Sequence, residues 1–285
     1  MKNYYFKFQT ENRGFGLWLE REKGGRIIPL SIYYGQWEVA DLESGLLQRT
    51  ASAKRQIITF FNLEKVQEEV FFWVFYLEKV YCFKGVDLKV FDGPEWGIYP
   101  GYGDLPKSIN AELIVTYEKI NLPEFFSNIN ANQRYNRGTI CELSGPANMY
   151  AKSLISGERI KISMDNFHEY LSPMEFETLI FMIFNNGGNL CSSFRGGTLK
   201  DYDLRVRLPQ DYYGMPAGQH WIQVKLKQNE KLKIDGFLVS ICDKSDLGKR
   251  IIGIDWIRDR VRESTSIQAW MKDMTLNYKN IDFSL

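Results

Sequence analysis

The stretch GGTLKDYDLRVRLPQDYYGMPAGQHWIQVKLK, residues 196–227, decides how the C-terminal part of this chain folds. Two segments of it, DLRVRL at 203–208 and HWIQVKLK at 220–227, alternate between apolar and polar residues, which is the pattern of half-buried β-strands. The residues between them, PQDYYGMPAGQ, are rich in Pro and Gly and form a turn-like connection. The stretch therefore predicts two strands paired as a hairpin.

Polar side chains gather at one end of this hairpin. Successive side chains of a strand point to opposite faces, so Gln223 and Lys225 share a face with Trp221. The same rule puts Asp201 and Asp203 on one face of the first strand, and pairing of the strands places Asp203 beside Gln223 and Lys225. An ordinary strand pair does not need these polar groups together.

A helix is expected over residues 172–186. Ser172 is a typical N-cap, Pro173 suits the first helical turn, Glu175 completes a capping box, and Asn186-Gly187-Gly188 ends the helix. Its apolar face predicts packing on a sheet and is formed by Phe176, Leu179, Ile180, Ile183 and Phe184. Glu177 lies at the edge of that face, from which it would join the polar cluster.

This combination suits metal-dependent hydrolysis of a phosphodiester. The Asp203 carboxylate, the Gln223 amide oxygen and the Val224 carbonyl are hard oxygen ligands for Mg²⁺, with Mn²⁺ as a possible substitute. The metal would acidify a bound water, and Lys225 would orient that water or stabilise charge in the transition state. Glu177 would bind a second ion or hold a water. The competing interpretation is that Lys225 extends from an edge strand into solvent with no catalytic role.

The order of these motifs resembles the Mrr-like branch of the PD-(D/E)XK restriction-endonuclease-like superfamily. The matching residues are Phe176-Glu177 on a helix, Gly196-Gly197, Asp203-Leu204, and Gln223-Val224-Lys225, within roughly residues 170–245. The resemblance implies an α/β core with a mixed, mainly four-stranded sheet flanked by helices, divalent-metal-dependent DNA cleavage, and a separate domain that selects the target. Asp203 is preferred over Asp201 because the family aspartate directly precedes its aliphatic strand. Gln223 replaces the glutamate of the superfamily name, although glutamine is usual in this branch.

Composition indicates two globular domains. The chain has 285 residues, of which 44% are hydrophobic and 25% charged, and we expect a β-rich α+β domain over 1–155 and the nuclease domain over 156–285. The formal charge of +1 argues against polyanion binding through overall charge, although Lys and Arg outnumber Asp and Glu in the C-terminal third. The four widely spaced cysteines indicate neither zinc nor disulfides. With no signal peptide and no membrane-spanning run, the expected location is the cytoplasm.

The N-terminal part is read as a recognition domain. Aromatic and β-branched runs at 4–9, 15–20, 26–34 and 111–120 predict strands, a helix is expected to begin near residue 51, and FFWVFYL at 71–77 is compatible with helix or strand. The Gly- and Pro-rich loop 91–108 carries Trp96, which we expect to stack on a flipped base, in loose resemblance to modified-base readers of the PUA-like group. Arg134 and Arg137 would contact DNA, with a solvated turn as the equal alternative.

The leading hypothesis is a restriction-type, Mg²⁺-dependent endodeoxyribonuclease that acts on double-stranded DNA, modified or not, as a homodimer. A nucleic-acid-binding or sensing protein on a non-catalytic nuclease-like scaffold is the alternative from another class, and Gln223 makes it conceivable. A defence nuclease gated by a small ligand is the third. The N-terminal part shows no βαβ alternation of the kind expected in a nucleotide-sensing Rossmann-like domain.

Overall fold

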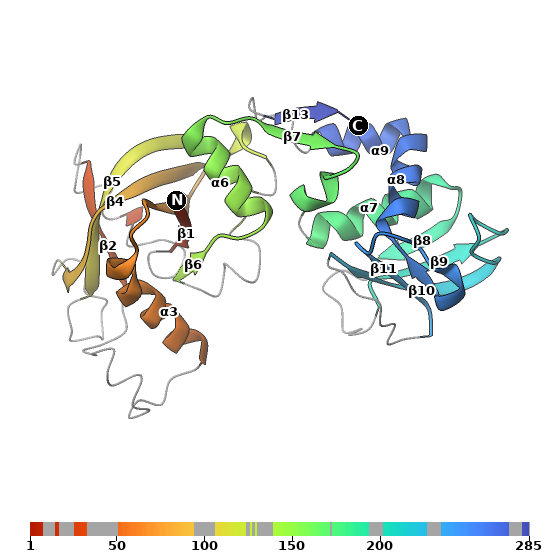
Figure 1. The fold of residues 1–285 in the computed structure, drawn as a ribbon, viewed down its shortest axis with the longest axis horizontal. Coiled ribbons are helices and arrows are strands. Elements are labelled where there is room, and N and C mark those ends of the chain that lie inside the picture. The colour runs from red at the N-terminus through yellow and green to blue at the C-terminus, as the bar shows by residue number, and fades with distance from the viewer. Residues whose placement is uncertain are drawn as a thin grey trace. The chain divides into compact units, whose positions relative to one another are not determined.

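The computed structural model describes residues 1–7, 15–16, 26–32, 51–93, 106–123, 126, 129, 139–171, 173–193, 202–226, 235–273 and 281–284. The chain divides into two compact units, Met1–Glu158 and Arg159–Leu285, compared with the predicted domains 1–155 and 156–285. Both units combine helices with sheets that contain parallel and antiparallel pairs, so the protein is a mixed α/β protein (Figure 1). In the described part, no helix is long and apolar enough to cross a membrane.

The first unit is built on a curved six-stranded sheet in the order β2-β5-β4-β3-β1-β6 (Figure 1). Among these described strands, only β1 and β3 pair in parallel. The elements are β1 Lys2–Phe6, β2 Ile27–Ile32, α3 Ala51–Phe61, η2 Asn62–Lys65, β3 Val70–Tyr76, β4 Lys79–Asp92, β5 Lys107–Glu118, η4 Lys119–Asn121, β6 Ile140–Glu142 and α6 Pro146–Ser156. The pairing of β4 with β5 shifts register at three points, and such irregularities bend a strand and strengthen its twist.

Aromatic side chains fill the core of this unit. The segment whose sequence is compatible with helix or strand is the strand β3, in which every residue from Val70 to Phe75 is buried. Trp73 lies in this core, and its indole N–H donates to the Asn3 side chain at 3.1 Å. The prediction of a strand over 15–20 is wrong where the structure describes it, because Phe15 and Gly16 are helical. Phe15 packs edge-on against Tyr81 in a cluster with Phe72 and Val74, whereas Trp73 packs with Tyr117 and Phe126.

The second unit contains a five-stranded mixed sheet in the order β12-β11-β10-β9-β8, against the mainly four-stranded sheet expected. Its elements are β7 Ile160–Ser163, η6 Phe167–Tyr170, α7 Pro173–Asn186, β8 Leu190–Ser193, β9 Leu204–Leu208, β10 Gly218–Lys225, β11 Phe237–Ser240, η7 Leu247–Lys249, β12 Ile251–Ile252, α8 Ile254–Glu263, α9 Thr265–Asp273 and β13 Ile281–Ser284. The expected helix is α7, which packs beside β8 and β10, while α8 and α9 pack on it (Figure 1). Strands β7 and β13 form a separate parallel pair.

The β9–β10 hairpin is present as predicted, with antiparallel pairs from Gly218–Leu208 to Ile222–Leu204. Strand β9 alternates strictly, since Leu204, Val206 and Leu208 are buried whereas Arg205 and Arg207 are exposed. Trp221 pairs with Arg205, so the odd-numbered residues of β10 share the exposed face of β9. The alternation read from the sequence therefore assigns Gln223 and Lys225 to that face.

Candidate active site

Asp203 is fixed at the open end of the hairpin, directly before β9. Its backbone N–H donates to the Ile222 carbonyl at 2.9 Å, and its carboxylate Oδ2 accepts a 2.6 Å hydrogen bond from the Val224 N–H. The Lys225 Nζ lies 3.5 Å from the same Oδ2. Residues of β10 thus hold the aspartate at both its backbone and its carboxylate, which sets the position of the carboxylate relative to the sheet.

The Asp203–Lys225 pair is half-open to solvent. The Lys225 side chain is 36% exposed and that of Asp203 is 23% exposed. A pair so exposed contributes at most about 1 kcal/mol to folding, because water screens it. The pair therefore contributes little to the stability of the fold, and its ammonium and carboxylate remain accessible to a ligand.

The other two oxygen ligands named from the sequence belong to consecutive residues of β10, the strand that contacts this carboxylate. The N–H and C=O of one strand residue project to the same edge, and the Val224 N–H points to Asp203, so the Val224 carbonyl does too. Gln223 lies directly before Val224 in the chain and is 7% exposed. One carboxylate, one amide and one carbonyl fit the oxygen-ligand chemistry of Mg²⁺, with water completing the shell.

The charge available to a metal is low. Within the described ranges, no group of three or more His, Cys, Asp or Glu side chains is placed to hold a metal ion. Asp203 would therefore be the only anionic ligand in the predicted set of Asp203, Gln223 and Val224. A cation with one protein carboxylate keeps several waters, and its affinity depends on further oxygen atoms from a substrate.

Glu177 lies on α7, the helix that packs beside β8 and β10, as the sequence predicts. Its side chain is half-buried and has interaction partners. Its part in the site beside Asp203 and Lys225 stays a prediction.

Sequence reasoning missed a second group of residues beside the pair. Arg205 and Arg207 are exposed on the same sheet face as Lys225, and neither has a hydrogen-bond or ion-pair partner in the described part of the chain. Trp221, on this face too, stacks on Tyr202 with ring centroids 4.6 Å apart. The alternation of LRVRL at 204–208 could have revealed this group, because it puts two arginines on one face of the strand and three buried residues on the other.

Several predicted residues lie outside the described part of the structure. They are Trp96, Arg134 and Arg137 of the proposed recognition surface, and Ser172, Gly196, Gly197 and Asp201 of the nuclease pattern. The four cysteines, all described, are free, with Cys82 and Cys242 buried. Burial raises the pKa of the Cys191 thiol to about 12, so it is protonated at neutral pH and unsuited to nucleophilic chemistry.

Comparison of the chain with models of protein families, with curated proteins and with solved structures finds no match.

Proposed function

We propose that the protein is a Mg²⁺-dependent endodeoxyribonuclease of restriction type, related to the Mrr-like branch of the PD-(D/E)XK superfamily. The observation that carries the proposal is the 3.5 Å approach of Lys225 to Asp203 at the end of the β9–β10 hairpin. The pair lies on the sheet face that also carries the exposed Arg205 and Arg207. A lysine, an aspartate and exposed arginines on one open face suit a phosphodiester substrate.

Each residue has a role in this proposal. Asp203, the Gln223 amide and the Val224 carbonyl would hold the metal, which when bound supplies a water of lowered pKa and positive charge near phosphorus. Lys225 donates hydrogen bonds from its ammonium to the attacking water or to the phosphate oxygens, where negative charge grows in the transition state. Arg205 and Arg207 pair with neighbouring backbone phosphates and fix the strand over the site.

The target would be chosen by the first unit, and cleavage of both strands would use two copies of the chain. The Trp96 loop and the Arg134 and Arg137 segment remain the proposed contacts with double-stranded DNA, modified or not. Trp73 has no part in this, because it is fully buried in the core.

A second candidate is a nucleic-acid-binding protein that keeps the nuclease-like arrangement without turnover. The single carboxylate among the proposed metal ligands favours it, since one anionic ligand holds Mg²⁺ weakly. Both candidates predict DNA binding through Arg205 and Arg207, and only the first predicts cleavage.

The experiment that tests the proposal is a plasmid assay with the full chain. Supercoiled DNA from methylating and non-methylating hosts is incubated with protein and Mg²⁺, with EDTA as the control. Conversion to nicked or linear DNA that EDTA stops supports the nuclease. Binding in a gel-shift assay with no conversion under either methylation state, with Mg²⁺ or Mn²⁺, supports the second candidate.

A further inference from the structure

A cavity of about 540 Å³ lies at the other end of the β9–β10 hairpin, between the ends of α7 and α8 and the connection that joins the two strands. Its lining includes Asn186, Gln210, Asp211, Tyr213, Arg260 and Glu263. This volume falls within the range of small-molecule sites. The cavity is separate from Asp203 and Lys225, which lie beyond the Ile222–Leu204 pair at the open end.

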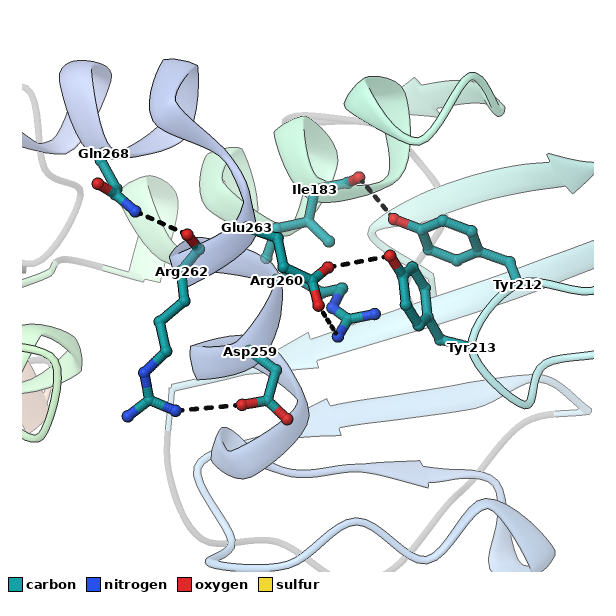
Figure 2. Close-up of polar contacts among 8 residues, drawn as sticks. All are labelled: Ile183, Tyr212, Tyr213, Asp259, Arg260, Arg262, Glu263 and Gln268. Atoms are coloured by element: carbon teal, nitrogen blue, oxygen red, sulfur yellow. Dashed lines mark hydrogen bonds and ion pairs between the residues drawn. The ribbon is translucent and has the colours of Figure 1, made fainter.

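Arg260 is a buried cation with most of its donors unused. The residue is 9% exposed, and its Nη2 donates to Glu263 Oε1 at 2.8 Å (Figure 2). Its Nε and Nη1 are buried and have no acceptor among the described residues, and the same holds for the indole Nε1 of Trp256, one turn earlier on α8. A buried donor without an acceptor is unfavourable, because it has lost its hydrogen bonds to water. Of these residues Arg260 lines the cavity, and its two buried nitrogens without an acceptor favour a site for an acceptor-rich ligand.

Tyr213 closes this site. Its ring lies over the guanidinium, 3.3 Å from the Arg260 carbon to the ring centroid, and its hydroxyl donates to Glu263 Oε2 at 2.9 Å (Figure 2). Yet half of Tyr213 is exposed to solvent. The ring is held by one hydrogen bond to an exposed carboxylate and by its stacking on the cation, and movement of the ring would uncover the guanidinium.

The rest of the cavity supplies complementary polar groups. Asp211 uses Oδ1 to accept from the Ala217 N–H, and the Gln210 side chain has no partner among the described residues. A guanidinium presents paired N–H groups that match the two oxygens of a phosphate or carboxylate. A ligand with an oxyanion would bind Arg260 through that group. The edge of a ring on the same ligand, if it carries hydrogen-bond donors, would contact Asp211 and Gln210.

We propose that this cavity binds a small organic oxyanion of nucleotide size, with its anionic group on Arg260 and the Tyr213 ring displaced. The site is independent of the proposed nuclease centre. Phosphate and carboxylate share the chemistry that Arg260 recognises, and a nucleoside monophosphate adds a planar ring with donors for Asp211.

The test is isothermal titration calorimetry on the full chain, in EDTA so that no metal contributes. The probes are AMP, GMP, CMP and UMP, then inorganic phosphate, and malate as a dicarboxylate. We expect at least one nucleotide to bind with a Kd below about 1 mM. If malate binds and the nucleotides do not, and Arg260→Lys weakens the binding of malate, the site is supported and its ligand is a carboxylate.

Variants assign the binding to the cavity. Arg260→Lys removes the planar fork and should weaken binding about tenfold or more. Arg262→Lys is the matched control, because Arg262 pairs with Asp259 outside the cavity lining and should leave the Kd unchanged (Figure 2). Tyr213→Phe removes the hydrogen bond that holds the ring closed and should tighten binding severalfold.

Two variants that retain Arg260 keep the test decisive if Arg260→Lys does not fold. Asp211→Asn and Tyr213→Phe change exposed side chains, and opposite shifts in Kd support the site. No heat with any probe at millimolar concentration overturns the proposal. So does binding that Lys225→Ala abolishes and Tyr213→Phe leaves unaltered, since the ligand would then lie at the Asp203 end.

Discussion

A cation lies beside a carboxylate at each end of the β9–β10 hairpin, and the two cations differ in their exposure to solvent. At the open end, Lys225 lies 3.5 Å from Asp203, and both side chains remain partly exposed. At the turn end, Arg260 donates to Glu263 at 2.8 Å and is buried under Tyr213. The exposed pair is weak and accessible, whereas the buried cation is firmly held and leaves donors unused.

The difference separates two kinds of chemistry. A compact ammonium at a solvent-open edge can meet charge that develops in a reaction, because the Lys225 side chain is 36% exposed. A planar guanidinium between aromatic rings is suited to hold a preformed oxyanion, since its geometry is fixed before the ligand arrives. We therefore propose turnover at the first end and ligand binding at the second.

The largest effect is expected from loss of Asp203. Asp203→Ala removes the only anionic metal ligand of the proposed set and should lower the rate of DNA cleavage by at least about 100-fold. It also takes the acceptor from the Val224 N–H, at a cost of about 1–3 kcal/mol in stability. Asp203→Asn keeps an acceptor oxygen and should retain stability while losing activity. Excess Mn²⁺ should restore a little cleavage to either variant.

Cleavage rates and urea unfolding curves, measured on both variants, check this prediction. Full activity in Asp203→Asn would remove Asp203 from the chemistry and leave the open end with a structural role. Replacement of Glu263 by Gln at the turn end is the comparison, and it should leave the cleavage rate unchanged.

Loss of the two exposed arginines should act on binding more than on chemistry. Arg205→Ala with Arg207→Ala should weaken DNA binding and reduce the slope of log K against log salt by about 1 for each phosphate that is no longer neutralised. Fluorescence anisotropy with a labelled duplex at several salt concentrations measures both. Arg262→Ala, on α8, is the control, and an equal change in its salt slope would show that the sheet face is not the DNA surface.

Gly187 offers a way to disturb the turn end alone. A Cβ at this position would lie 2.5 Å from the Tyr212 ring, whose hydroxyl donates to the Ile183 carbonyl. Gly187→Ala should therefore displace Tyr212 and lower stability by about 1–3 kcal/mol. Thermal unfolding with and without nucleotide tests this, and the cleavage rate of the folded variant should stay within about twofold of wild type. A much larger loss of cleavage would mean that the two ends are coupled.

Two buried tryptophans should give the smallest and most specific contrast. Trp73→Phe removes a donor that Asn3 accepts and leaves that acceptor unpaired, so it should cost about 1–3 kcal/mol beyond the loss of ring area. Trp256→Phe removes a donor that has no acceptor in the described part of the chain, so it should not carry the cost of an unpaired acceptor. Urea unfolding of both variants measures the difference. Equal destabilisation would indicate that the Trp256 N–H is satisfied in solution.

The hairpin was predictable because its signal is local. The alternation of 203–208 and 220–225 needs only the period of a strand, and it assigned Gln223 and Lys225 to the same face as Arg205. Helix α7 was equally clear from its apolar spacing and its flanking Pro and Gly residues. The proximity of Asp203 and Lys225 followed from register alone, and their catalytic role stays a prediction.

Features that depend on tertiary packing were not predictable. FFWVFYL at 71–77 is apolar throughout, so periodicity did not distinguish the strand β3 from a buried helix. The Arg260 cavity joins α7, α8 and the hairpin turn, and no sequence spacing relates Tyr213 to Arg260.

The most direct test of the account is single-turnover cleavage of a labelled duplex by wild type and by Lys225→Ala, with DNA binding measured on the same duplex in Ca²⁺. In the proposed nuclease Lys225 acts on charge that develops in the transition state, so its loss should reduce cleavage about 100- to 1,000-fold. The Kd for DNA should change by less than about threefold, and Mn²⁺ should not restore activity. Lys249→Ala, which removes an exposed lysine paired with Asp246, should match wild type in both measurements. Equal losses of binding and cleavage in Lys225→Ala, or undiminished cleavage, would contradict the assignment of catalysis to the open end of the hairpin.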